Sequence, residues 1–211
     1  MREKTIWQRI LYASKDLPLI IGALIVAALI LLAVIGPEIA PRNPFFHDRI
    51  QYIDGELQRA PFSPGGVYPL GTDANGIDLL SLILYGARTT ISIVLAATAL
   101  RLMVGFFSGV LAGWWSGSWF DRLVLSLIQL FAAVPPLILA VILILAIGIR
   151  MGPIAFIAAI AVTGWGEIAQ ILRSHVISIR QMDYVEGAYA VGVEPLEILS
   201  RHVLPNLLGV M

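Results

Sequence analysis

Long apolar segments alternate with polar ones along the 211-residue chain, and this alternation predicts four helices that cross a membrane. A helix needs about 20 mostly apolar residues to span the hydrocarbon core of a bilayer. The first candidate has that length without a single charge, whereas the second and fourth each contain a charged residue and the third is interrupted by two prolines. The four predicted spans cover residues 17–36, 91–115, 123–149 and 153–172.

Basic residues are concentrated before the first predicted span. They are Arg2, Lys4, Arg9 and Lys15. Positive charge beside a membrane helix is retained on the cytoplasmic side, so we expect residues 1–16 to be cytoplasmic. Four crossings then place the long segment 37–90 outside the cell and the segment 173–205 inside it.

The external segment 37–90 is rich in Pro, Gly, Asp and Asn, a composition that favours turns over a packed domain. Its stretch "DANGID", residues 73–78, has only part of the ligand spacing of a calcium loop, and no Glu completes it. We interpret this stretch as a turn. From 79 to 93 apolar residues return among scattered polar ones, which predicts a helix at the membrane interface before the second span.

Glycines recur at every fourth position along the second predicted span and just beyond it. Residues at this spacing lie on one face of a helix, where glycine lets another backbone approach closely. The spacing fits packing inside the chain's own bundle and fits an interface with another subunit. The four glycines are Gly105, Gly109, Gly113 and Gly117.

Two adjacent prolines, Pro135 and Pro136, interrupt the third predicted span. Proline lacks the backbone N–H, and its ring clashes with the preceding turn, so we expect a kinked helix here. The kink is compatible with simple curvature and with a role in shaping a translocation path.

Two charged residues lie deep inside predicted spans, Arg101 in the second and Glu167 in the fourth. At 1.5 Å per residue their depths differ by about 6 Å, which an arginine side chain can cover. A charge near the middle of a bilayer is costly and should face protein, water or a partner. We expect the two to pair, either to hold two helices together or to line a path.

Composition agrees with a membrane protein and excludes several classes of function. Hydrophobic residues make up 58% of the chain and charged residues 13%, against about 25% charged in soluble domains. The formal net charge of zero gives no basic field for nucleic acid. The chain has no cysteine and no phosphate-binding loop, and His47, His175 and His202 are far apart. We expect no metal, no cofactor and no catalytic residue.

After Arg173 the sequence becomes polar and predicts two short helices that meet at Gly192. Glycine suits a left-handed turn after one helix, and Pro195 suits the first turn of the next. Pro205 either ends that second helix or begins the next span. Leu196, Leu199 and Val203 form an apolar stripe on the second helix, which is suited to docking in a partner's groove. A hairpin folded back on its own bundle would give the same pattern.

This segment resembles the "EAA" motif of ABC importer permeases, in which Glu-Ala-Ala is followed by Gly and then by Ile-x-Leu-Pro at fixed spacing. The spacing is kept here, although Gly187 replaces the first Ala and His202 stands at the Ile position. The stretches "YPLGTDANGIDLLSLILYGART" and "GWGEIAQILRSHVISIRQMDYVEGA" resemble the dipeptide, oligopeptide and nickel branch of that family. Ile77 and Gln170 depart from it, since the branch commonly has Arg at both places.

The resemblance implies an all-α polytopic membrane protein with the type I ABC importer permease fold, located in the plasma (inner) membrane. It implies coupling to ATP-hydrolysing subunits, pairing with a second permease subunit, delivery by an external substrate-binding protein, and short peptides, nickel or related solutes as substrates. The residues expected to couple to the ATPase subunit are Glu186, Gly187, Ala188, Gly192, Glu194, Pro195, Leu196, Leu199, Leu204 and Pro205.

Members of this family normally have about six spans, so a chain with four, and with 206–211 as the start of another helix, resembles a truncated permease. One alternative function is a membrane-embedded enzyme built around Arg101, Glu167 and the prolines, although no nucleophile with a base is present. Another is a fragment that binds the ATPase subunit without transporting.

Overall fold

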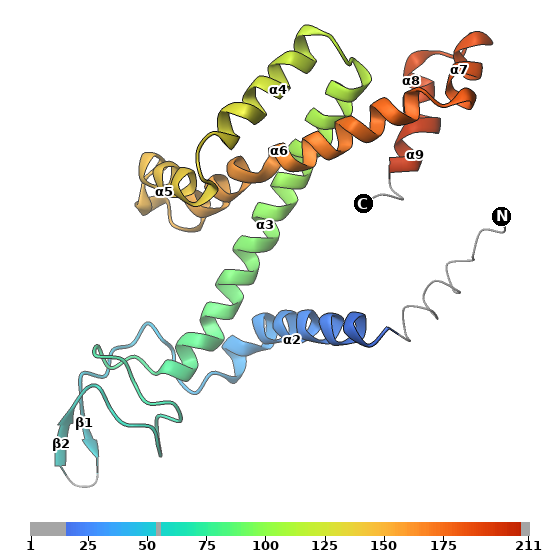
Figure 1. Cartoon of the computed structure of the whole chain (residues 1–211). Helices are drawn as coiled ribbons and strands as arrows, with labels where there is room; N and C mark the ends of the chain where they lie inside the picture. Colours follow the sequence, from blue (N-terminus) through green and yellow to red (C-terminus); the bar gives the residue numbers. More distant parts are fainter. Residues whose placement is uncertain (1–15, 54–55, 208–211) are drawn as a thin grey trace. The chain divides into compact units, whose positions relative to one another are not determined.

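The computed structural model describes residues 16–53 and 56–207, and its regular secondary structure is helical apart from one short hairpin (Figure 1). It divides into two compact units, Met1–Ser92 and Ile93–Met211. The predicted all-α polytopic fold is confirmed, since three of the described helices are long and apolar enough to cross a membrane. The four basic residues that predict the orientation lie outside the described residues.

In the first unit, α2 (Leu17–Ile39) begins where the apolar sequence begins and ends three residues beyond the predicted span. Pro18, at its first turn, costs no backbone hydrogen bond there. Nearly all of α2 is exposed in the isolated chain, and its buried residues are Ala33 and Gly36. A Cβ on Gly36 would be 2.9 Å from the Leu84 carbonyl oxygen, so this end of α2 lies directly against the backbone of the third helix.

The segment between α2 and the next long helix is packed, contrary to the expectation of turns alone. Strands β1 (Ile50–Ile53) and β2 (Glu56–Arg59) form an antiparallel hairpin in which Ile50 pairs with Arg59. The rings of Phe62 and Tyr68, both buried, stack with centroids 5.3 Å apart. Buried polar side chains add hydrogen bonds, which turn-forming composition alone does not reveal. "DANGID" is a turn, as predicted, in which Asp73 accepts hydrogen bonds from two backbone N–H groups.

Helix α3 (Leu79–Trp114) is continuous over 36 residues. The sequence predicted a separate interfacial helix over 79–93, followed by a span beginning at 91; no break in the helix divides the two. The segment contains no proline and only one glycine before the predicted span, Gly86, so nothing in it stops a helix. At 1.5 Å per residue α3 is about 54 Å long, well beyond the roughly 30 Å of the hydrocarbon core.

In the second unit, the predicted kinked span 123–149 is instead two helices, α4 (Trp119–Ala132) and α5 (Pro136–Ile147), bent by 96°. The two prolines remove two consecutive donors, so the helix stops and restarts. A 3₁₀ turn, η1 (Ile149–Met151), then leads to α6 (Pro153–Arg180), against which α5 packs. If the bent pair counts as one span, the described residues contain up to four.

Helix α6 continues to Arg180, eight residues past the predicted end of the fourth span, because its helical pattern of apolar residues persists there. Short helices follow at its C-terminal end (Figure 1). They are α7 (Asp183–Ala190), α8 (Pro195–Ile198), the π-helix η2 (Leu199–Val203) and α9 (Leu204–Leu207). A buried apolar cluster joins α3, α6 and these helices.

Candidate functional site

Three of the four glycines in the predicted stripe lie against α6. A Cβ built on Gly105 or Gly113 would be 2.9 or 2.8 Å from a carbonyl oxygen of α6, and one on Gly109 would overlap the backbone of Ala169. Gly117 lies beyond the end of α3, with φ +84° and open space around it. The glycine contact is therefore inside this chain, and Gly117 is not part of it.

Arg101 reaches α6 one turn earlier. Its guanidinium fills the space beside Gly164, where a Cβ would overlap it, and its Nε is buried without a hydrogen-bond partner among the described residues. Glu167 is exposed in the isolated chain, and no ion pair of the described residues joins it to Arg101. The predicted direct pair is not formed, because Gly164 faces α3 whereas Glu167 faces α4 and α5.

Arg173 has a different partner, which the sequence did not predict. Its Nε and Nη2 donate to the two carboxylate oxygens of Asp121 at 2.5 and 2.8 Å. Asp121, with its side chain only 3% exposed, also accepts from the Gly117 N–H, while its own N–H donates to the Ser118 hydroxyl. The Ser-x-x-Asp spacing at the start of α4 is a capping signal that the sequence carries. The pair fixes the N-terminus of α4 to α6.

The turn between α7 and α8 has the predicted geometry. Gly192 has φ +83°, the left-handed conformation expected of it, and Pro195 occupies the first turn of α8. Arg180, at the end of α6, donates to the Trp114 carbonyl at 2.5 Å and lies over the Trp114 ring, 5.2 Å from its centroid. The C-terminal ends of α3 and α6 are thereby tied together directly beside this turn.

The predicted docking stripe is wrong in two of its three members. Leu199 and Val203 are buried in the chain's own core, with Leu199 8% exposed, whereas Leu196 is 76% exposed. The reason is that α8 and η2 fold back on α6 and α3, the hairpin alternative compatible with the same spacing. Among the other expected coupling residues, those exposed in the isolated chain are Glu186, Gly187, Gly192, Glu194, Pro195 and Pro205.

Pro205 does not end the helical segment, which continues through it to Leu207. It lies within α9 directly after the π-helix, in which the Leu204 N–H donates to the carbonyl of Leu199, five residues back. The wider turn accommodates a residue that has no N–H to donate. Leu204 is partly buried against the core cluster, as is Ala188.

A cavity of about 240 Å³ lies where α4, α5 and α6 meet. Its apolar wall includes Ile128 and Phe131 of α4, and its polar side chains come from α6. Those polar residues are Thr163, Glu167 and Gln170. The two prolines create this space, because a helix that continued unbroken through the third predicted span would have no gap at this point.

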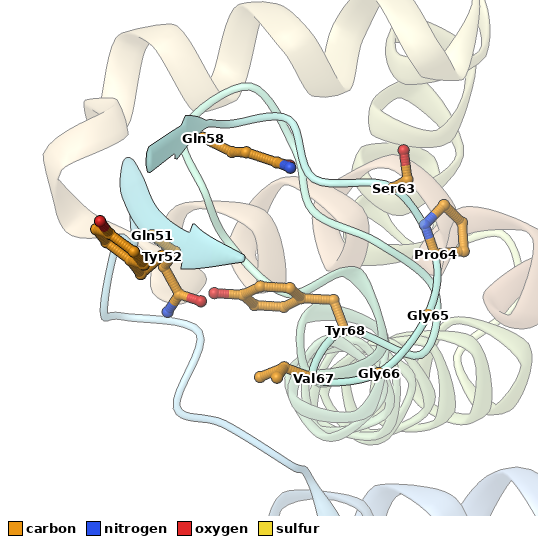
Figure 2. Close-up of a pocket in the computed structure, with 9 residues that line it drawn as sticks. All are labelled: Gln51, Tyr52, Gln58, Ser63, Pro64, Gly65, Gly66, Val67 and Tyr68. Atoms are coloured by element: carbon orange, nitrogen blue, oxygen red, sulfur yellow. The ribbon is translucent and has the colours of Figure 1, made fainter. Parts of the chain in front are cut away.

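A larger cavity of about 600 Å³ lies in the segment between α2 and α3, between the hairpin and the 63–68 loop (Figure 2). Its wall is polar and aromatic but carries no charged side chain, with Gln58 and Ser63 among the lining residues. Tyr68 at its base donates to Asp48 at 3.1 Å, and burial is the main cause that raises the pKa of this tyrosine. Arg42 donates to the same carboxylate at 2.5 Å.

Comparison with known proteins matches residues 102–211 to the family described as "binding-protein-dependent transport system inner membrane component". The dipeptide transport system permease protein DppC of Bacillus subtilis is 28% identical over 203 residues, covering 96% of this chain and 59% of the relative. A putative peptide transport system permease protein of Brucella suis is 31% identical over 192 residues, covering 90% and 60%.

The glutathione transport system permease protein GsiD of Pectobacterium atrosepticum is 29% identical over 160 residues, covering 76% of this chain and 52% of the relative. The chain thus spans about three-fifths or less of the length of these relatives. The family match covers more than half of the chain and includes the whole segment that carries the "EAA" resemblance. The chain therefore belongs to the binding-protein-dependent transport system inner membrane components, integral proteins of the inner membrane.

Proposed function

We propose that this chain is a transmembrane permease subunit of an ABC importer for short peptides or related small solutes. It pairs with a second permease subunit, receives substrate from an external binding protein, and is driven by ATP-hydrolysing subunits on the cytoplasmic side. It carries out no chemistry itself. Relatives named for dipeptide, oligopeptide and glutathione transport support this substrate class.

The observation that carries the proposal is the shared core beneath α7 and α8. Buried residues of α3, α6, α7, α8, η2 and α9 form one cluster, which includes Trp114, Val176, Val185 and Ile198. Packed interiors resist deformation, so a displacement of α7 or α8 moves the ends of α3 and α6 with them. A partner that pushes on the exposed side of this segment therefore acts on two long helices at once.

The residues that contact the ATPase subunit are, on this proposal, the exposed members of the predicted set, with Leu196 as the apolar anchor. Glu186 and Glu194 add charge, while Leu199 and Leu204 act from inside by holding the segment in place. Leu196→Asp should lose copurification with the ATPase subunit, because docking would bury an uncompensated charge. Ser200→Asp, exposed in the same segment, is the matched control. Wild-type copurification of Leu196→Asp would contradict this contact.

The four-crossing topology is part of the proposal, with the N-terminus and residues 173–205 cytoplasmic and 37–90 external. It requires α4 and α5 together to count as one crossing. Because the chain has no cysteine, single cysteines report sidedness directly. Cysteine at Gln58 should react with an impermeant thiol reagent in intact cells, and cysteine at Ser200 only after permeabilisation. Reaction of both from outside would mean an even number of crossings between the two positions and would rule out the three that this topology places there.

We propose that the translocation path runs along the α4–α5 side of α6, where Glu167 and the cavity lie. Arg101 is assigned to the other side, where it holds α3 and α6 beside Gly164. In the assembled importer, substrate uptake with labelled dialanine tests the function as a whole. ATP-dependent accumulation that requires this chain supports it, and accumulation that is unchanged without the chain refutes it.

A further inference from the structure

The cavity at the α4–α5 break has an acceptor-rich wall. In a continuing helix, the N–H groups of residues 135 and 136 would donate to the carbonyls of Phe131 and Ala132, four residues back. Both positions are prolines, which have no N–H to donate. Within the described part of the chain, no backbone or side-chain group donates to these two carbonyls. Both residues line the cavity. The C-terminal end of α4 therefore presents free carbonyl oxygens, together with the negative end of its dipole.

A carboxylate completes this wall from the opposite helix. Glu167 lines the same cavity and makes no hydrogen bond or ion pair with other described residues. An ionisable residue inside a membrane helix marks a substrate or ion pathway by default. Helix C-terminal ends and free carbonyls at broken membrane helices are likewise groups that coordinate cations. Charge and dipole thus select a positively charged group.

The kind of cation follows from the size and the remaining wall. A space of about 240 Å³ is far larger than a bare ion and suits a small organic group. No cluster of three or more His, Cys, Asp or Glu residues occurs among the described residues, so a tightly held metal is disfavoured. Apolar contacts come from Ile128, Val134 and Val162. The wall therefore offers acceptors at one side and apolar surface at the other.

We propose that this cavity binds the protonated amino group of a substrate, with Glu167 and the Phe131 and Ala132 carbonyls as acceptors and the adjoining side chain against the apolar wall. The inference rests on the proposed import of peptides, whose amino-termini supply such a group. It makes Glu167 a specificity residue of the path and gives the double proline a function, since the break exposes the carbonyls.

Protection of a single cysteine tests the site without the binding protein. In membranes with the assembled importer, Val134→Cys lines the cavity, and the chain has no other cysteine to react. Alaninamide, which carries an ammonium group, should slow its reaction with N-ethylmaleimide, and N-acetylalaninamide should not. Glu167→Gln should raise the alaninamide concentration for half-protection about tenfold, because hydrogen bonds to charged groups contribute on that order. Leu145→Cys, exposed elsewhere on α5, is the control and should show no protection.

Equal protection by both amides, protection by nickel chloride alone, or no protection at all would overturn the proposal. Glu167→Asp keeps the charge, so protection at an alaninamide concentration near that of the parent would support the proposal. If Glu167→Asp needs as high a concentration as Glu167→Gln, the result would count against it. Dialanine uptake by the unmodified importer separates the two levels of the argument. If dialanine is imported but alaninamide gives no protection, only the proposed amino-group site is refuted. If dialanine is not imported, the proposed function is refuted.

Discussion

The face of α6 that lies against α3 is packed onto backbone, whereas the face toward α4 and α5 borders a cavity. On the first face glycines of α3 meet the α6 backbone and Ala169 is fully buried. On the second face Glu167 and Gln170 are exposed. One helix thus provides a rigid contact on one side and a polar, partly open wall on the other. The proposed function uses both faces, the first to transmit motion and the second to line the path.

The largest effect should follow from filling the rigid face. Gly109→Leu would place a side chain inside the backbone of Ala169, and no rotamer avoids this overlap. We expect loss of folded protein, measured as the yield of monodisperse protein in detergent. Gly86→Leu, on the same helix but with no atom within 4 Å of a Cβ, is the control and should keep its yield. Normal yield of Gly109→Leu would show that the two helices do not touch there.

A somewhat smaller loss should follow from breaking the α4–α6 ion pair. Asp121→Asn leaves the Arg173 guanidinium without its anionic partner, and removing one member of a buried pair typically costs about 3–5 kcal/mol. Because the Arg173 side chain is 21% exposed, we expect the free energy of unfolding to fall by about 2 kcal/mol, measured by unfolding in detergent. The double variant Asp121→Leu with Arg173→Met should recover much of this. A loss in the double variant as large as in Asp121→Asn would show that the pair is not the source.

Two glycines of α6 that are two residues apart offer a direct contrast between its faces. Gly164→Ala would displace the Arg101 guanidinium, whereas a Cβ on Gly166 would lie 3.3 Å from the Ile128 side chain, which can adjust. We expect Gly164→Ala to destabilise by about 1–3 kcal/mol and Gly166→Ala to change stability by less. Thermal unfolding of the two variants side by side measures this. Equal losses of stability in the two variants would contradict the proposed difference between the two faces.

The smallest effect on stability should come from Glu167→Gln. The carboxylate has no partner among the described residues, so its loss should leave unfolding within about 0.5 kcal/mol of the parent. Its effect should appear in dialanine uptake as a higher KM. A large loss of stability would mean that Glu167 is a structural residue instead of a wall of the path.

The spacing of apolar residues and the turn-forming residues predicted much of the fold. The apolar runs predicted the long helices, and the conformations of Gly192 and Pro195 followed from backbone constraints of those residue types. The glycine spacing predicted a close helix contact but not its partner. The outcome for Gly117 depended on where α3 ends, and helix ends are the least certain feature of such patterns.

Tertiary context decided what the sequence left open. The stripe containing Leu199 and Val203 was equally compatible with a partner's groove and with the chain's own core, and only the folding of α8 onto α6 distinguished them. The depth estimate for Arg101 and Glu167 ignored helix rotation, which places them on different faces. The double proline predicted a kink, whereas the removal of two adjacent donors produced a bend of 96°.

The most direct test of the two-faced α6 is a cysteine scan along it in the assembled importer. Single cysteines at Val162, Gly166, Glu167 and Gln170 should react with a charged thiol reagent, and their rates should change when the ATPase subunits are trapped with vanadate. Cysteines at the buried positions Ala169, Leu172 and Val176 should stay unreactive in both states. Uniform reactivity around the helix, or reaction on the α3 face alone, would contradict the account.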